Sequence, residues 1–150
     1  MTARKPTMVA RARPRRLRRL LRWLLAIAWL GAFTLSHLPA ERLRGLEASD
    51  KALHAAGFAG LTTLLWLVLA VDGRPARRRL PLVALAMALY GALDELTQPW
   101  FNRWASWDDW LFDCLGALAS LAVLESAAWL WKAGRRRKGR KEQGCMGCRG

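Results

Sequence analysis

Carboxylates, an amide and a guanidinium gather in residues 94–113, at the junction of two apolar segments that are each long enough to cross a bilayer. The members of this group are Asp94, Glu95, Gln98, Arg103, Asp108, Asp109 and Asp113. Charge is costly near hydrocarbon and persists there when it is paired, hydrated or used, so the group predicts a functional site. The residue types alone do not name a reaction.

Helical spacing arranges these and other polar residues into three sets, because positions three or four apart share one face of a helix. Each set falls at one end of a predicted helix: Asp50, Lys51 and His54; Glu95 and Gln98; Asp109 and Asp113. An antiparallel bundle brings these three ends to one side, with Arg103 in the adjoining loop. Asp94 adjoins Glu95 but points about 100° away from it, so we do not expect both to face one site.

Three kinds of chemistry are open to such a cluster. His54 and Glu95 are candidate catalytic residues for proton transfer. His54, Glu95 and Asp109 are candidate ligands for a divalent metal, and Arg103 is a candidate to hold an anion through paired hydrogen bonds. We assign no resident metal and no cofactor, because the chain carries no nucleophile elbow, phosphate-binding glycine loop or paired Cys/His zinc motif.

The structural alternative is that these groups only cap helix starts and tie helix ends together. Asp50 and Asp109 each follow a serine closely, so capping alone explains them as well as a binding role does. His54 and Glu95 lie deepest, and capping explains them least, which favours binding for the cluster as a whole. The predicted binding residues are Lys51, His54, Glu95, Gln98, Arg103, Asp109 and Asp113.

A shared site makes a geometric demand across helices. We expect the side chains of His54 and Glu95 to lie within hydrogen-bonding or one-water reach of each other. Arg103 is expected to fold back over them. His37, in Ser36-His37-Leu38-Pro39, lies at the same interface and is a weaker candidate member.

Four apolar segments must position these residues, and they span about 20–38, 52–71, 80–98 and 109–131. A helix of roughly 20 residues crosses the hydrocarbon core, so each segment predicts a transmembrane helix. The fold class is therefore all-α, a polytopic membrane protein with a four-transmembrane-helix bundle. The basic tails 1–19 and 132–150 are expected to be disordered.

Charge segregation predicts the orientation. Of the 25 Lys and Arg residues, nine lie in 1–22, four in 74–79 and eight in 132–149, which are same-side positions for four spans. The positive-inside rule then places both termini in the cytoplasm. This pattern explains the net charge of +14 better than nucleic-acid binding does. Tryptophans are expected to form belts at both interfaces, one from Trp100, Trp104, Trp107 and Trp110, the other from Trp23, Trp129 and Trp131.

Smaller signals concern helix ends and packing. Pro81 suits the first turn of the third helix, Pro99 its end, and Ser106-x-x-Asp109 a capping box before the fourth. Small residues predict close helix contacts at Ala84, Ala88, Ala92, Gly116 and Ser120, and also at Gly57 and Gly60.

The chain's start and its cysteines allow two further expectations. Residues 1–36 resemble a signal peptide but lack a small-x-small cleavage site, which favours an uncleaved anchor. Cys145-x-x-Cys148 has no second ligand pair and is expected to be reduced.

The ordered polar motifs resemble the VanZ-like family of small bacterial membrane proteins. The resemblance covers about 23–131 and rests on the combined set Ser36-His37-Leu38-Pro39, Asp50-Lys51-x-x-His54 with Phe58, Glu95-x-x-Gln98-Pro99, Arg103, and Asp109-Trp110-x-x-Asp113-x-x-Gly116. The family often carries Asn where Asp113 stands here. Its name comes from a protein that contributes low-level resistance to the glycopeptide antibiotic teicoplanin.

The resemblance implies a role in the cell envelope and leaves two hypotheses. The first is a non-enzymatic membrane protein that binds an envelope lipid or glycopeptide-related ligand at its outer face, with Lys51 and Arg103 as anion contacts. The second is a small membrane enzyme acting on a lipid-linked envelope precursor. Glu95 or His54 would then be the general base, Asp109 and Asp113 would be metal ligands, and Arg103 would clamp the phosphate. The expected partners are the lipid bilayer and an anionic lipid or precursor.

Overall fold

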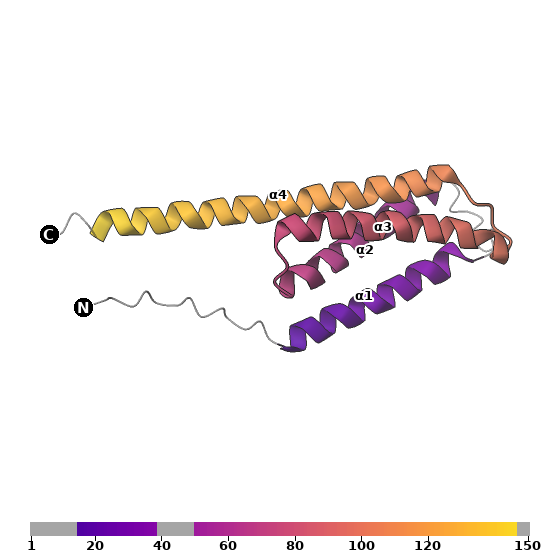
Figure 1. The fold of residues 1–150 in the computed structure, drawn as a ribbon, viewed down its shortest axis with the longest axis horizontal. Coiled ribbons are helices and arrows are strands. Elements are labelled where there is room, and N and C mark those ends of the chain that lie inside the picture. Colours follow the sequence, from indigo (N-terminus) through magenta and orange to yellow (C-terminus); the bar gives the residue numbers. More distant parts are fainter. Residues whose placement is uncertain (1–14, 39–49, 147–150) are drawn as a thin grey trace.

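The computed structural model describes the backbone of residues 15–38 and 50–146 and the side chains of residues 15–38 and 51–137. These residues form the α-helices α1 (Arg15–Ser36), α2 (Asp50–Val71), α3 (Ala76–Thr97) and α4 (Trp107–Met146), with the 3₁₀ turn η3 (Gln98–Phe101) after α3. The predicted fold class, an all-α four-helix bundle, is confirmed (Figure 1).

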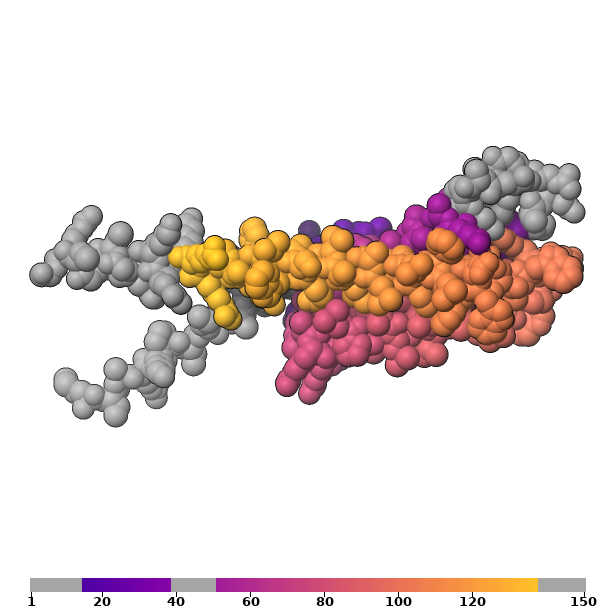
Figure 2. Space-filling model, turned by 90° about the horizontal axis from the view of Figure 1, so that it is seen from above, coloured from indigo at the N-terminus to yellow at the C-terminus, as the bar shows by residue number. Residues whose placement is uncertain are grey.

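The four helices alternate in direction, so the bundle has two chemically distinct ends (Figure 1). We call the end where α1 and α3 stop and α2 and α4 start the polar end. The opposite end, the basic end, holds the start of α1, the α2–α3 turn and the C-terminal half of α4. Helix α4 extends beyond the others there, and it runs along the whole face seen in Figure 2, with α3 beside it.

The side-chain distribution is inverted relative to a water-soluble bundle. Large apolar residues such as Leu30, Leu96 and Val123 are 68% exposed, whereas as many polar as apolar side chains are buried among the described residues. Each helix is long and apolar enough to cross a membrane. Hydrocarbon accepts the outward leucines, and polar groups avoid it by facing the bundle interior.

Helices α2 and α4 approach closely at Gly116. A Cβ added at this glycine would lie 2.1 Å from the carbonyl oxygen of Ala55, so only glycine permits the observed spacing. One turn further along, Thr63 Oγ1 and Ser120 Oγ lie 2.9 Å apart across the same interface. The predicted roles of Gly116 and Ser120 are thus confirmed. Those of Gly57 and Gly60 are wrong, because an added Cβ at either would meet nothing within 4 Å.

The hydroxyl pair between α2 and α4 is expected to add little stability. Ser120→Ala should lower the free energy of unfolding by about 0.6 kcal/mol, the average for interhelical hydrogen bonds inside membrane proteins. Thr63 keeps a second partner, the carbonyl of Ala59 at 2.8 Å, so no unpaired donor remains. Reversible unfolding of the purified protein in mixed micelles measures the change. A loss above about 2 kcal/mol would contradict this assignment.

The basic end is closed by an internal ion pair. Glu125 on α4 accepts hydrogen bonds from Arg79 Nε at 3.1 Å and from Trp66 Nε1 at 2.8 Å. The Arg79 guanidinium also stacks 4.2 Å from the Trp66 ring centroid. Arg79 is therefore the cation that pairs with Glu125. At the surface nearby, Arg22 of α1 donates to Asp72 in the α2–α3 turn at 2.9 Å.

Three helix boundaries differ by more than two residues from those predicted. Helix α1 begins at Arg15 and α4 continues to Met146, where disordered tails were expected. Lys, Arg, Ala, Glu and Gln are good helix formers, and extending an existing helix avoids the cost of nucleation. Helix α3 begins at Ala76 with Pro75 as its N-cap, so Pro81 lies inside the helix rather than in its first turn.

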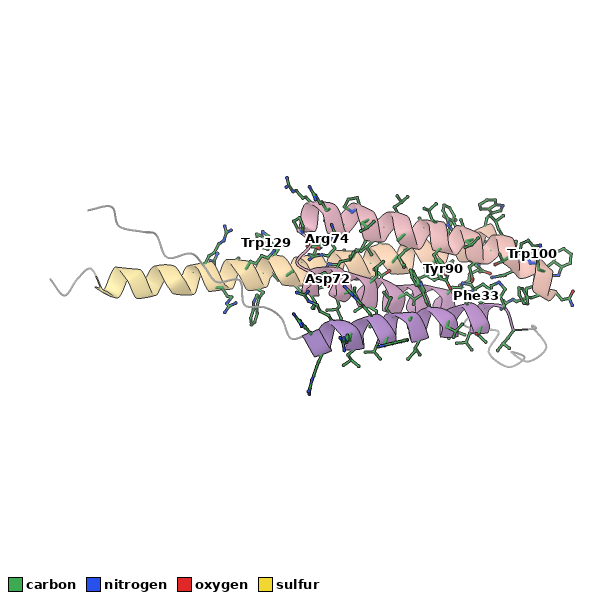
Figure 3. All side chains as sticks on the ribbon, turned by 60° about the horizontal axis from the view of Figure 1, so that its bottom comes forward. Phe33, Asp72, Arg74, Tyr90, Trp100 and Trp129 are labelled. Carbon is green, nitrogen blue, oxygen red and sulfur yellow. The ribbon has the colours of Figure 1, made fainter. Side chains whose placement is uncertain are left out.

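The aromatic residues mark both ends, as Figure 3 shows for Trp100 and Trp129. The first predicted belt is exposed at Trp100, Trp104 and Trp107, while Trp110 turns inward and donates to the carbonyl of Ala88 at 3.1 Å. Trp23, Trp129 and Trp131 are exposed towards the basic end. Indole rings at these two levels suit the two interfaces of a bilayer.

Candidate functional site

A histidine and an aspartate form the centre of the polar end. His54 Nδ1 of α2 lies 3.0 Å from Asp113 Oδ1 of α4, and the side chains are 7% and 0% exposed. The Asp113 side chain packs against Gly91 of α3, which has no side chain to obstruct it. A Cβ added at Gly91 would lie 3.2 Å from Asp113 Oδ2. The close approach at Gly116, one helical turn after Asp113, holds α2 and α4 near enough for the pair.

Glu95 joins α3 to the start of α4. Its Oε2 accepts the backbone N–H of Ser106 at 2.7 Å, and its Oε1 accepts Gln98 Nε2 at 3.2 Å. Ser106 caps α4 as predicted, since its hydroxyl accepts the backbone N–H of Asp109. In a capping box the acidic residue of the same helix would bind the Ser106 N–H. Here Glu95 takes that role from the neighbouring helix.

The two hydrogen bonds to Glu95 predict that Glu95→Gln and Glu95→Ala differ in stability. Glu95→Gln keeps an oxygen acceptor for Ser106 N–H, whereas Glu95→Ala leaves donors at Ser106 and Gln98 without their partner. A buried unpaired donor costs about 1–3 kcal/mol, so Glu95→Ala should be less stable than Glu95→Gln by that amount. Chemical unfolding of both variants measures it. Equal stability would show that water replaces the carboxylate without cost.

The predicted contact between helices is confirmed. His54, Glu95 and Asp113 each offer a ligand atom, and these three atoms lie within 4.8 Å of one another. His54 and Glu95 are therefore within one-water reach. All three side chains are buried, and they come from α2, α3 and α4. The third member of this group is Asp113, where the sequence suggested Asp109.

The other predicted binding residues lie around this centre. Gln98 is fully buried beside Glu95, and Asp109 is 9% exposed at the start of α4. Arg103 does fold back, but Nη1 donates to the carbonyl of Ser36 at 3.0 Å, and no ion pair joins it to Glu95 among the described residues. Lys51 stays at the surface, where Nζ lies 3.3 Å from Asp108. The side chains of Asp50, with its predicted capping role, and of Cys145 are not among the described side chains, and Cys148 lies outside the described residues.

A second polar group, underrated from the sequence, joins α1 to α3. Ser36 Oγ donates to Asp94 Oδ1 at 2.8 Å, and His37 Nε2 lies 2.9 Å from Thr97 Oγ1. Asp94 does point away from Glu95, as expected, yet it is 2% exposed and His37 is 6% exposed. The sequence indicated this second group through Asp94 and Thr97, which are three positions apart and therefore share one helix face.

Several buried oxygens at this end have no hydrogen-bond partner among the described residues. They are Tyr90 OH, Asp94 Oδ2, Gln98 Oε1 and Asp113 Oδ2. Tyr90 packs between Phe58 and Trp29, at ring-centroid distances of 5.4 and 5.6 Å. Buried polar groups are nearly always paired with protein, water or an ion. This concentration of free acceptors fits a site that holds water or a cation.

Comparison of the chain with protein families, curated proteins and solved structures finds no match in any of the three. The geometry of the polar end and the motifs themselves are therefore the observations that bear on function.

Proposed function

We propose that this chain is a VanZ-like, non-enzymatic membrane protein of the bacterial cell envelope that binds an envelope lipid or glycopeptide-related ligand at its outer face. The observation that carries the proposal is the convergence of the motif residues. Ser36, His37, His54, Glu95 and Asp113 are separated by up to 77 positions in sequence, yet all lie at the polar end. Ser36 and His37 contact Asp94 and Thr97 of the neighbouring helix, and His54, Glu95 and Asp113 meet across three helices. Unconnected helix caps would not need such contacts.

The proposed orientation places the basic end in the cytoplasm and the polar end on the outer side. Support comes from the basic residues of α1, the α2–α3 turn and α4, which share one end of the bundle. Reporter fusions after Gly73, Ser106 and Lys132 test it. We expect cytoplasmic signal at Gly73 and Lys132 and external signal at Ser106. The reverse pattern at Gly73 and Ser106 would overturn the orientation.

The proposed ligand contacts are the cations at the rim of the site. Lys51 is half exposed and Arg103 is partly buried at the polar end, so both can meet an anionic head group that the buried carboxylates would repel. Mass spectrometry of lipids that co-purify with the protein tests this contact. We expect one envelope lipid class to be enriched with the native chain and reduced for Arg103→Ala. Arg135→Ala, an exposed cation at the basic end, is the matched control. Identical lipid profiles for all three proteins would contradict the proposal.

A membrane enzyme acting on a lipid-linked envelope precursor is the second candidate. It is favoured by the 3.0 Å contact between His54 and Asp113, because a carboxylate that binds one ring nitrogen orients a histidine for proton transfer. Incubation of the purified protein with a bacterial lipid extract tests for turnover. Product formed by the native protein and lost in His54→Ala would favour the enzyme over the binding protein.

A further inference from the structure

We infer that His54, Glu95 and Asp113 form a binding site for one divalent transition-metal ion, with Zn²⁺ the best match. The inference goes beyond the proposed function, and its failure would leave that proposal standing. Its first support is the geometry, since one ligand atom from each residue lies within 4.8 Å of the other two. Ligand atoms of a tetrahedral zinc ion lie about 3.4 Å apart. Side-chain rotations that move these ligand atoms by about 1 Å therefore complete the site.

The second support is the free coordinating capacity of the two carboxylates. Asp113 Oδ2 is buried in a side chain that is 0% exposed and has no hydrogen-bond partner among the described residues. Each oxygen of Glu95 accepts one described hydrogen bond and keeps a second lone pair. Gln98 Oε1 is also buried without a partner among the described residues, so the residue beside Glu95 has a free acceptor of the kind that a metal-bound water requires.

The third support is the balance of charge. Asp94 and Asp109 add their negative charge to the same region as Glu95 and Asp113. The nearby cations have other partners, since Arg103 donates to Ser36 and Lys51 to Asp108. Buried carboxylates stay ionised only beside a compensating positive charge, and a metal ion supplies that charge without desolvating another side chain.

The donor set selects the kind of metal. One imidazole nitrogen and two carboxylate oxygens suit Zn²⁺, which binds three protein ligands and leaves one position open in catalytic-type sites. Mg²⁺ and Ca²⁺ prefer shells made only of oxygen, and they take six or more ligands. We therefore expect Zn²⁺ to bind in the presence of excess Mg²⁺.

The test is zinc titration of the purified, chelator-stripped protein against a chromophoric competitor. The full chain is used with Cys145→Ser and Cys148→Ser, because that thiol pair would bind zinc independently. We expect one Zn²⁺ per chain. Glu95→Gln and Asp113→Asn should each weaken the affinity by more than about tenfold. Asp108→Asn is the matched control, an exposed carboxylate at the same end, and should leave the affinity unchanged.

X-ray absorption at the zinc edge keeps the test decisive if a variant fails to fold. The native chain should show a shell of nitrogen and oxygen at about 2.0–2.2 Å without sulfur. No stoichiometric binding, a sulfur shell, or equal affinity in Glu95→Gln, Asp113→Asn and Asp108→Asn would overturn the inference. Lipid co-purification by the chelator-stripped protein is measured in parallel, so that loss of the metal site and loss of lipid binding are told apart.

Discussion

Gly116→Ala is expected to lower the free energy of unfolding by about 3 kcal/mol, the upper part of the range for overpacked interiors. The added Cβ would lie 2.1 Å from Ala55 O and 2.8 Å from Ala55 C and Cα. These are backbone atoms, so no rotamer change relieves the clash and α2 must move away from α4. Reversible unfolding in mixed micelles measures the loss.

The matched control is Gly57→Ala, on the facing helix α2. An added Cβ there meets nothing within 4 Å, and Ala is a better helix former than Gly by about 1 kcal/mol. Gly57→Ala should therefore be neutral or stabilising. If the two variants were equally stable, the contact between α2 and α4 would not be as close as the structure has it.

Arg79→Ala is the second substitution with a large expected effect, on the order of 3 kcal/mol. It removes a 7% exposed cation and leaves Glu125, which is 20% exposed, without its ionic partner. Stacking on Trp66 is lost at the same time. The same unfolding measurement detects the change.

Two further variants, Arg79→Lys and Arg78→Ala, test how much of this loss comes from charge alone and how much depends on the position and shape of the Arg79 side chain. Arg79→Lys keeps the charge but loses the planar stack and the paired donors, so an intermediate loss is expected. Arg78→Ala removes an exposed cation from the adjacent position and should change stability by less than about 0.5 kcal/mol. Similar losses for Arg78→Ala and Arg79→Ala would contradict the internal ion pair.

The sequence predicts the four helices and the meeting of His54 with Glu95, and both follow from simple physical rules. Apolar length determines membrane helices, and the 3.6-residue period places Glu95 with Gln98 and Asp109 with Asp113 on shared faces. The contact of His54 with Glu95 followed from combining helix ends with antiparallel order. Gly116 was recognisable because a small residue in an apolar helix signals close packing.

Other features depend on rotations of one helix about its axis, which spacing within that helix does not determine. The sequence allowed Asp109 or Asp113 to face His54, and the space at Gly91 decides for Asp113. Gly57 and Gly116 look alike in sequence, yet only Gly116 faces a neighbour. The spacing of Lys51 from His54 placed both on one helix face, but the long side chain of Lys51 reaches Asp108 at the surface and does not enter the buried centre with His54.

The geometry of the polar end predicts that the polar residues of α2, α3 and α4 act as one unit and not as separate helix caps. A double-mutant cycle between His54→Ala and Glu95→Ala in the metal-free protein tests it most directly, with unfolding free energy as the readout. Residues that share a site couple by about 0.5–3 kcal/mol, and this is the expected result for ligand atoms within 4.8 Å. Losses that add to within about 0.3 kcal/mol would show that His54 and Glu95 stabilise their own helices independently, and would contradict the shared site.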